Sequence, residues 1–333
     1  MVPTIRDVAQ RAEVSISTVS RVLNKSASVD EAKRKRVQAA AEALGYSPNP
    51  NALSLRGQST GGIGVLLPYI AGDFFSEFLL EIDRTTQESG HFLIVSSSHR
   101  NLASFKAVIQ GMKHRVDGLI VMSTQVPAET VRTWLPERLP VLFVNSQVEG
   151  SDIETVNFDN VGGAYHLTEH LIELGHTRIA FVKGPEGSFD GLARLDGYRN
   201  ALRAHGIEPS PALEFEGDFS MESGLAAVPK ILATDPRPTA LFAANDLSAY
   251  GALSGLREAG LQVPEDIALA GFDDSRLAQF SSPSLTTVHA PAQEMGQRAI
   301  EGLLSRIRGD DDSLPTSVLL PTHVVAREST IGR

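Results

Sequence analysis

TIRDVAQRAEVSISTVSRVLN, residues 4–24, predicts two short helices joined by a tight turn. Thr4 is a good N-cap for the first helix, because its hydroxyl can accept a hydrogen bond from a free backbone N–H in the first turn. Asp7, three residues on, places a negative charge where it favours the helix dipole. The apolar stripe of this helix follows at helical spacing and consists of Val8, Ala9 and Ala12.

The second helix opens on a run of hydroxyl groups, with Ser15 as its predicted N-cap. Its buried face has i, i+3, i+4 spacing and consists of Val19, Val22 and Leu23. The side chains left to face outward are Ile16, Ser17, Thr18, Ser20 and Arg21. This set suits the DNA major groove, because Arg can read guanine, hydroxyls can contact phosphates or base edges, and Ile can touch a thymine methyl. The pattern therefore predicts a helix-turn-helix, although spacing alone also allows a plain helical bundle with a polar exterior.

Charge separates these two interpretations. Residues 1–60 hold nine Lys or Arg and five Asp or Glu, a net charge of +4, whereas the whole chain carries −10. A basic end on an acidic body is typical of a nucleic-acid-binding segment joined to another domain. A third helix, capped by Asp30, is expected to pack on the first two, and its apolar face consists of Ala32, Val37, Ala40, Ala41 and Leu44.

The stretch 4–24 resembles the head of the lactose-repressor (LacI/GalR) transcriptional regulators, as do LGYSPN at residues 44–49 and Ser54-Leu55. The resemblance covers the whole chain. It implies that Ile16, Ser17 and Arg21 read bases at the start of the recognition helix. It implies that a second set of residues contacts the phosphates and backbone of the DNA. Such contacts fix the position of the protein on the duplex and carry no sequence preference. That set is Thr4, Ser15, Thr18, Ser20 and Asn24.

Residues 48–57, PNPNALSLRG, resemble the hinge helix of that family. Asn49 as N-cap and Pro50 at the first helical position are favourable local chemistry, but so short a helix is unstable alone. By resemblance it forms when two copies meet over the operator, with Asn49, Ala52 and Leu55 at the DNA and Leu55 wedged into the minor groove. Leu53 stands where Arg is common in the family, and a plain interdomain linker is the alternative.

From Gly61 onward, short apolar runs alternate with helix-length amphipathic stretches. The predicted strands are Ile63–Leu67, Phe92–Ser96, Gly118–Met122, Val141–Val144, Ile179–Val182, Ala240–Ala243 and Ile267–Gly271. The predicted helices are Phe75–Ser89, Asn101–Arg115, Val161–Leu174, Arg194–His205, Gly224–Thr234 and Asp246–Ala259. This alternation predicts parallel sheets wound on both faces, and the length predicts two lobes. We therefore expect a helix-turn-helix domain over 1–47, a hinge and linker over 48–60, and a two-lobed α/β domain over 61–333.

Polar and aromatic side chains follow the ends of the predicted strands, where doubly wound sheets bind ligands. Aromatic faces together with Asp, Asn and Arg suit a polyol, because rings stack on its C–H faces and polar groups pair with its hydroxyls. Later motifs such as Gly184-Pro185 and Asn245-Asp246 resemble the effector domain of the same family, itself similar to periplasmic sugar-binding proteins. The predicted effector-binding residues are Phe74, Phe75, Ser123, Asn145, Ser188, Asp190, Arg194, Phe219, Asn245 and Asp273.

The resemblance implies effector contacts for Asp190, Arg194, Asn245 and Asp273, and aromatic walls at Phe74, Phe75 and Phe219. A carboxylate at position 190 beside Arg194 favours a sugar over a purine. A purine or a sugar phosphate remains the alternative effector. A cytoplasmic homodimer on a pseudo-palindromic operator is expected, with repression rather than activation by analogy with the family.

An enzyme is the alternative from another class. His166-Leu167-Thr168-Glu169-His170 has the HxxEH spacing of one metallopeptidase class, but its leucines also make an ordinary amphipathic helix. We expect no metal, no cofactor and no enzymatic activity. The chain has no cysteine, hence no disulfide, and it has no signal peptide and no apolar run of the length a membrane span needs.

Overall fold

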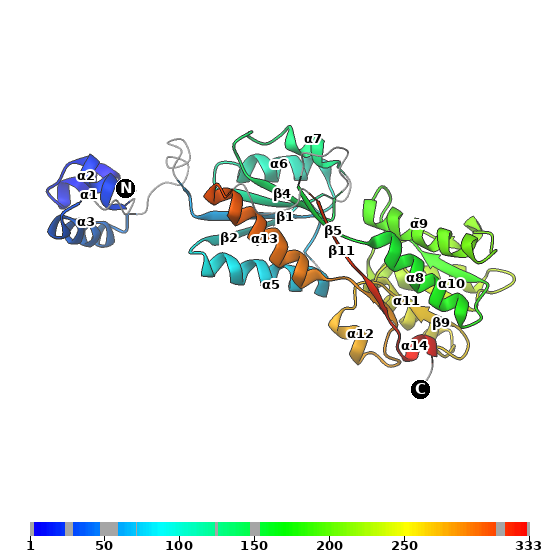
Figure 1. The fold of residues 1–333 in the computed structure, drawn as a ribbon. Helices are drawn as coiled ribbons and strands as arrows, with labels where there is room; N and C mark the ends of the chain where they lie inside the picture. Colours follow the sequence, from blue (N-terminus) through cyan, green and yellow to red (C-terminus); the bar gives the residue numbers. More distant parts are fainter. Residues whose placement is uncertain are drawn as a thin grey trace. The chain divides into compact units, whose positions relative to one another are not determined.

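A computed structural model describes residues 3–23, 29–46, 59–70, 72–123, 126–146, 154–310 and 317–331. The chain separates into two compact units, Met1–Thr60 and Gly61–Arg333. The predicted fold class is confirmed: the first unit is helical, and the second has two lobes built on parallel sheets (Figure 1).

The first unit contains the three predicted helices, α1 (Ile5–Arg11), α2 (Ile16–Leu23) and α3 (Glu31–Leu44). Thr4 and Asp7 form a reciprocal capping box at α1, in which the Thr4 backbone N–H donates to Asp7 Oδ2 at 2.7 Å and the Asp7 N–H donates to Thr4 Oγ1 at 3.4 Å. Asp30 Oδ1 accepts from two backbone N–H groups at the start of α3. The three helices share one small core, which consists of Val8, Ala9, Ala12, Val19, Val22, Val37, Ala40 and Ala41.

The first lobe of the second unit has a six-stranded parallel sheet in the order β11-β5-β4-β3-β1-β2. Its strands are β1 (Gly62–Leu67), β2 (Phe92–Ser97), β3 (Gly118–Met122), β4 (Val141–Val144), β5 (Thr155–Phe158) and β11 (Ser317–Leu320). Helices α5 (Asp73–Glu88) and α13 (Ala292–Arg308) cover one face, while α6 (Leu102–Met112) and α7 (Ala128–Arg132) cover the other (Figure 1). Each face has its own core, because successive side chains of a strand point to opposite sides.

The second lobe has a four-stranded parallel sheet in the order β7-β6-β8-β9. Its strands are β6 (Ile179–Val182), β7 (Glu214–Phe215), β8 (Ala240–Ala243) and β9 (Ala268–Ala270). Helices α8 (Asn160–Glu173) and α9 (Phe189–Ala204) pack on one face, and α10 (Met221–Leu232) and α11 (Asp246–Glu258) on the other. The short elements are η1 (Pro211–Leu213), α12 (Arg276–Phe280), α14 (Glu328–Ile331) and an antiparallel pair, β10 (Thr287–His289) with β12 (His323–Val325).

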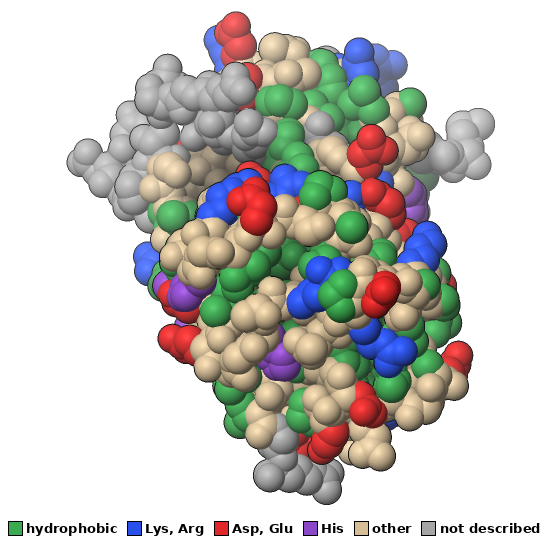
Figure 2. Space-filling model, turned by 90° about the vertical axis from the view of Figure 1, so that its right-hand side faces the viewer, with side chains coloured by type: hydrophobic (Ala, Val, Ile, Leu, Met, Phe, Trp, Pro, Cys, Tyr) green, Lys and Arg blue, Asp and Glu red, His purple; other side chains and the backbone are tan. Residues whose placement is uncertain are grey.

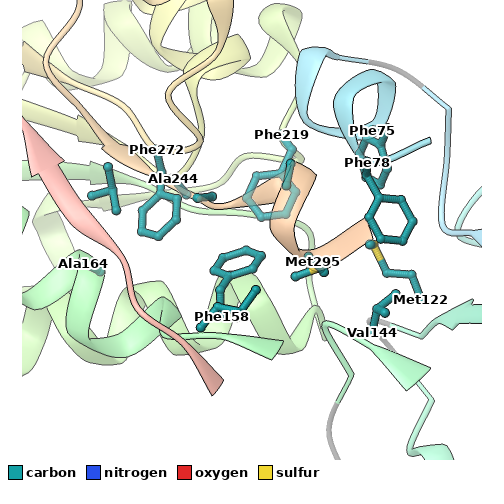
Figure 3. Packing of buried hydrophobic residues seen from close by; sticks show 14 of the residues in the cluster. Phe75, Phe78, Met122, Val144, Phe158, Ala164, Phe219, Ala244, Phe272 and Met295 are labelled. Atoms are coloured by element: carbon teal, nitrogen blue, oxygen red, sulfur yellow. The ribbon is translucent and has the colours of Figure 1, made fainter. Parts of the chain in front are cut away.

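Within the described chain, the backbone passes between the lobes three times. It crosses from β5 to α8, from β10 to α13, and from β11 to β12. One core cluster runs through both lobes, and Figure 3 shows Phe158, Phe219 and Phe272 of this cluster together with Met295 of α13. The ends of the strands of the two sheets therefore face a common space.

The sequence prediction misplaced one helix start that matters for the site. Helix α9 begins at Phe189, whereas the apolar pattern predicted its start at Arg194. Ser188 is the N-cap, and its Oγ accepts from the Gly191 N–H at 3.4 Å. Asp190 consequently lies in the first turn of a helix instead of in a loop.

The prediction also missed four strands of only two to four residues, namely β5, β7, β10 and β12. Residues 61–333 carry a net charge of −14. On the face shown in Figure 2, acidic and basic side chains are interspersed, so this surplus does not gather into one patch there.

Candidate ligand cleft and nucleic-acid interface

A cavity of about 810 Å³, including its open mouth, lies between the strand ends of the two lobes. Nine of the ten predicted effector-binding residues line it, and they come from both lobes. They are Phe74, Phe75, Asn145, Ser188, Asp190, Arg194, Phe219, Asn245 and Asp273. The cavity thus has the composition of a ligand site, with aromatic walls and a few convergent polar groups.

Ser123 does not line this cavity. Its backbone N–H donates to Ser146 Oγ at 2.9 Å, and its hydroxyl donates to the Val126 carbonyl oxygen. It lines a smaller neighbouring pocket with Arg100 and Phe105. The hydroxyl of Ser123 is therefore bound to the backbone near the start of α7, a contact that its place after a strand did not reveal.

Arg194 is the fixed polar centre of the cleft and is only 4% exposed. Its Nε donates to Asn160 Oδ1 at 2.9 Å, and its Nη1 donates to the Ala244 carbonyl oxygen at 2.6 Å and lies 3.3 Å from Asp273 Oδ1. Its guanidinium stacks on the Phe272 ring, 3.8 Å from the centroid. These contacts hold the guanidinium in place before any ligand arrives.

Asn160 extends this polar chain to the first lobe, because its Nδ2 donates to Asn145 Oδ1 at 3.1 Å. Asn145 follows β4 and adopts a positive φ of 42°. Asn160 was not among the predicted site residues, since it follows the short strand β5, which the sequence pattern did not reveal.

Buried carboxyl groups surround the guanidinium. Burial raises the pKa of Asp273 to about 8, although Arg194 acts in the opposite direction and the carboxylates of Asp246 and Asp190 add to the increase. Burial also raises the pKa of Asp246 to about 6, against the hydrogen bonds from Thr287 and Ser275. Both residues line the cavity: Asp246 is held by the hydrogen bonds from Thr287 and Ser275, whereas the carboxyl of Asp273 lies beside Arg194.

Aromatic rings wall the cleft. Phe74 packs edge-on against Phe75 with centroids 5.4 Å apart, and it lies 5.8 Å from Phe158. Phe219 adopts a positive φ of 67° beyond the second lobe's sheet. Its ring approaches Gly184 so closely that a Cβ there would lie 2.5 Å from it, which explains the glycine after β6.

Two further lining residues, Tyr69 and Arg100, were not among the ten predicted effector-binding residues. The Arg100 guanidinium stacks on the Tyr69 ring at 4.1 Å and donates to the Asp218 carbonyl oxygen of the other lobe at 2.6 Å. Both residues follow strand ends, which is the signal that could have identified them.

Helix α2 presents the predicted DNA-reading side chains. Ile16, Ser17 and Arg21 are exposed, while Val19 and Val22 are buried in the small core. Ser15 Oγ lies 2.8 Å from Ser17 Oγ and 2.9 Å from Thr18 Oγ1, so the hydroxyls form one cluster at the start of the helix. Ser20 is half-buried, and Thr4 caps α1. The predicted contacts Asn24, Asn49, Ala52 and Leu55 lie outside the described residues.

The HxxEH segment forms part of α8 and does not gather metal ligands. His166 Nδ1 lies 3.3 Å from Glu169 Oε2, whereas His170 Nε2 lies 3.1 Å from Thr330 Oγ1. Among the described residues there is no group of three or more His, Asp or Glu that could hold a metal ion. Nor does that part of the chain contain a helix long and apolar enough to cross a membrane.

Comparison with known proteins finds a matching family model in each of the two units. Residues 4–49 match the model of bacterial regulatory proteins of the lacI family, and residues 168–330 match that of the periplasmic binding protein-like domain. The chain is 36% identical to the HTH-type transcriptional repressor PurR of Edwardsiella ictaluri over 99% of this chain and 97% of the relative.

Two solved structures are similar over nearly the full length. The lac repressor dimer bound to operator and the anti-inducer ONPF has a TM-score of 0.82 and 32% identity, with 99% of each chain covered. The complex of the transcriptional regulator CelR with cellobiose has a TM-score of 0.74 and 34% identity, covering 98% of this chain and 99% of that one. The protein belongs to the LacI family of bacterial regulatory proteins and is a DNA-binding transcriptional regulator.

Proposed function

We propose that this protein is a cytoplasmic repressor that binds a pseudo-palindromic operator as a homodimer and responds to a sugar held in the interlobe cleft. The observation that carries the proposal is the cleft itself, where a fixed guanidinium, carboxyl groups and stacked aromatic rings converge from both lobes. Hydroxyl-rich ligands satisfy such a mixture of donors and acceptors, and the rings cover their apolar faces. The similar CelR structure holds cellobiose, which supports the same class of ligand here.

In this proposal the domains are 1–47 for DNA, 48–60 for the hinge and 61–333 for effector and dimer contacts. Ile16, Ser17 and Arg21 read bases, and the remaining head and hinge residues position the protein on the duplex. Exposed apolar side chains on α5 and α12, among them Leu80, Leu277 and Phe280, support a dimer surface on the second unit. The similar lac repressor structure is a dimer on its operator, which supports the same assembly.

The cleft's carboxyl groups serve binding rather than catalysis in this proposal, and the protein needs no metal or cofactor. Arg194 pairs with Asp273, and Asp246 accepts from Thr287 and Ser275, so these groups already have structural partners. An inert protein in assays with glycoside and ester substrates is the expected result.

A thermal-shift screen tests the ligand class. The panel contains D-ribose, D-glucose, cellobiose, glucose 6-phosphate, hypoxanthine and guanine, each added to the full-length protein. A ligand at about one hundred times its dissociation constant stabilises the folded state by about 2.7 kcal/mol. Stabilisation by an uncharged sugar is expected. Stabilisation confined to purines, as the similarity to PurR would allow, or to the phosphate ester contradicts the sugar assignment.

Selection of binding sites from a random DNA pool tests the DNA function separately. We expect a pseudo-palindromic sequence to be enriched, with two half-sites related by the dimer's two-fold symmetry. Enrichment of a single, unpaired half-site would contradict the proposed dimer on DNA.

A further inference from the structure

The loop between β9 and α12 carries an unusual pair of backbone conformations. Asp273 has a φ of 122° and Asp274 a φ of 57°, both in the region that residues with a side chain seldom adopt. Two such residues in succession cost free energy and persist only where neighbouring groups hold them. The first of them bears the carboxyl group that lies beside Arg194 in the cleft.

Asp274 supplies the contacts that hold this turn. Its Oδ2 accepts from His289 Nδ1 at 3.0 Å, and its Oδ1 accepts from Arg327 Nη2 at 2.6 Å. The backbone adds three bonds. The Asp273 N–H donates to the Val288 carbonyl oxygen at 2.9 Å, the Asp274 N–H donates to Thr287 Oγ1 at 3.3 Å, and the Asp273 carbonyl oxygen accepts from the Ala290 N–H at 3.4 Å. The turn is thus tied by its side chain to β10 and to the segment that follows β12.

His289 lies where the chain leaves the second lobe. It is the last residue of β10, and α13 of the first lobe begins three residues later, at Ala292. Its ring packs against that of His323 of β12, tilted by 37° with centroids 4.9 Å apart, and its Nδ1 lies 3.0 Å from Asp274 Oδ2. Glu77 of α5 is the charged group of the first lobe that acts on it, with Asp73 and Arg276 acting in turn on Glu77.

We propose that His289 is a positioning residue of the effector site: by its ion pair with Asp274 it holds the strained turn at 273–274 and thereby fixes the Asp273 carboxyl group in the cleft. The proposal rests on the proposed function in one respect, namely that the cleft takes an effector. It follows that how firmly the Asp273 carboxyl group is held in the cleft depends on pH, because a histidine forms an ion pair with a carboxylate only while the histidine is protonated.

The direction of this dependence follows from the local charges. The hydrogen bond to Asp274 raises the pKa of His289 above its ordinary value, while partial burial acts against the increase. Burial alone would raise the pKa of Asp274, but the hydrogen bonds from His289 and Arg327 bring it below its ordinary value. The ion pair is therefore complete at mildly acid pH and is lost as the pH rises through the raised pKa of His289. Arg327 stays bound to Asp274 at high pH, so the turn loosens without being released.

Hydrogen–deuterium exchange of the ligand-free, full-length protein tests the proposal. Exchange of peptides that cover 268–281 is compared at about pH 6 and about pH 9 after correction for the intrinsic rate. The wild type should exchange about two- to fivefold faster at the higher pH, the size expected for a half-exposed ion pair. H289Q should exchange fast already at about pH 6. H289K should lose the part of the pH dependence that His289 contributes, because lysine keeps its charge, so that in both variants only the ionisation of Asp273 still acts on the turn.

The control is H323Q, which changes the stacked histidine and leaves the Asp274 pair intact. It should keep the pH dependence of the wild type. The proposal is overturned if the wild type shows no pH dependence, if H323Q abolishes it, or if H289Q and H289K both retain the full dependence of the wild type. The last result would assign the dependence to Asp273, whose pKa of about 8 also lies in this range.

Binding measurements then separate this proposal from the proposed function. Calorimetry with D-ribose and with cellobiose should show affinity that falls from about pH 6 to about pH 9 by about two- to fivefold more in the wild type than in H289K, in which only Asp273 ionises. If neither sugar binds the wild type at either pH, the sugar assignment fails, while the exchange experiment still decides the role of His289. A sugar that binds with the same pH dependence in the wild type, H289K and H289Q contradicts the link from His289 to the cleft.

Discussion

At the scale of single residues, Arg194 links the fold to ligand binding. It is buried, and its partners come from β8, α8 and the 273–274 turn. A buried cation is stable only where acceptors replace the water it has lost. The hydrogen bonds that stabilise the Arg194 guanidinium in the interior also fix its orientation in the cleft.

Replacing Arg194 with alanine should destabilise the second unit by roughly 3 kcal/mol, since it leaves buried acceptors and the Asp273 carboxyl group without their partner. It should also abolish stabilisation by any cleft ligand. Urea unfolding followed by circular dichroism measures the first effect. Arg203→Ala, on the exposed side of the same helix, is the control and should change stability by less than about 0.5 kcal/mol. Equal effects of the two substitutions would contradict the central role of Arg194.

The Asp273 carboxyl group should make stability depend on pH. Its pKa rises from an ordinary 3.8 in the unfolded chain to about 8 in the fold, so the folded state holds the proton more tightly. Its contribution is therefore fully present below about pH 4 and declines as the pH rises to about 8. Asp273→Asn should lack this decline, and the difference in unfolding free energy between the two proteins should shift in favour of the variant with rising pH. A difference that stays constant from about pH 5 to about pH 9 would show that Asp273 ionises normally.

At the scale of elements, the N-terminal ends of helices supply several of the residues that line the cleft. Ser188 caps α9 and places Asp190 in its first turn, and Asn245 caps α11 by accepting from the Ser248 N–H at 3.0 Å. Asn245 also donates to the Phe219 carbonyl oxygen at 3.1 Å, which ties an aromatic wall to a helix cap. Capping residues thus serve both the helix and the cleft, because helix starts in such sheets lie at the ligand edge.

Helix α2 is the element on which sequence-specific DNA binding is predicted to depend. Arg21→Ala should lower operator affinity by about 1–3 kcal/mol and relax the preference for one base pair in each half-site. The measurement is a selection from random DNA, repeated with the variant, followed by fluorescence anisotropy on the selected site. Arg11→Ala, in the last turn of α1, should leave the base preference as it is. An unchanged preference in the Arg21 variant would remove Arg21 from the base-reading set.

At the scale of the whole molecule, function requires that the cleft and the DNA-binding unit affect each other. The two lobes share one continuous core and three crossings, so a ligand that contacts both lobes favours one arrangement of them. Thermodynamic linkage then demands that effector and operator change each other's affinity by the same factor.

The hinge is the predicted route of this coupling. Leu55→Ala should weaken operator binding, because the variant lacks the minor-groove wedge, and should leave the affinity for a cleft ligand in DNA-free protein unchanged. Fluorescence anisotropy with the selected operator measures the operator affinity, and calorimetry with the sugar found in the screen measures the ligand affinity. Operator affinity equal to that of the wild type would refute the wedge.

The sequence by itself determined the helical head, the alternating α/β body and nine of the ten residues predicted to line the cleft. These features depend on local information: caps such as Thr4, apolar spacing such as Val19 and Val22, and the rule that parallel strands end at a common edge. A family resemblance added the pairing of the head with a two-lobed body and supported the choice of cleft residues. Phe219, which follows none of the predicted strands, came from the resemblance alone.

Only the tertiary structure decided which polar groups are available in the cleft. Ser123 follows a strand as Asn145 does, yet its hydroxyl donates to the Val126 carbonyl oxygen. Asn160, which accepts from Arg194, follows a strand too short to show a pattern. The charge of Asp273 and the role of His289 likewise depend on partners distant in sequence, Arg194 and Asp274. Hydrogen bonds and pKa values are set by neighbours in space, and packing of separate segments, not local sequence pattern, brings those neighbours together.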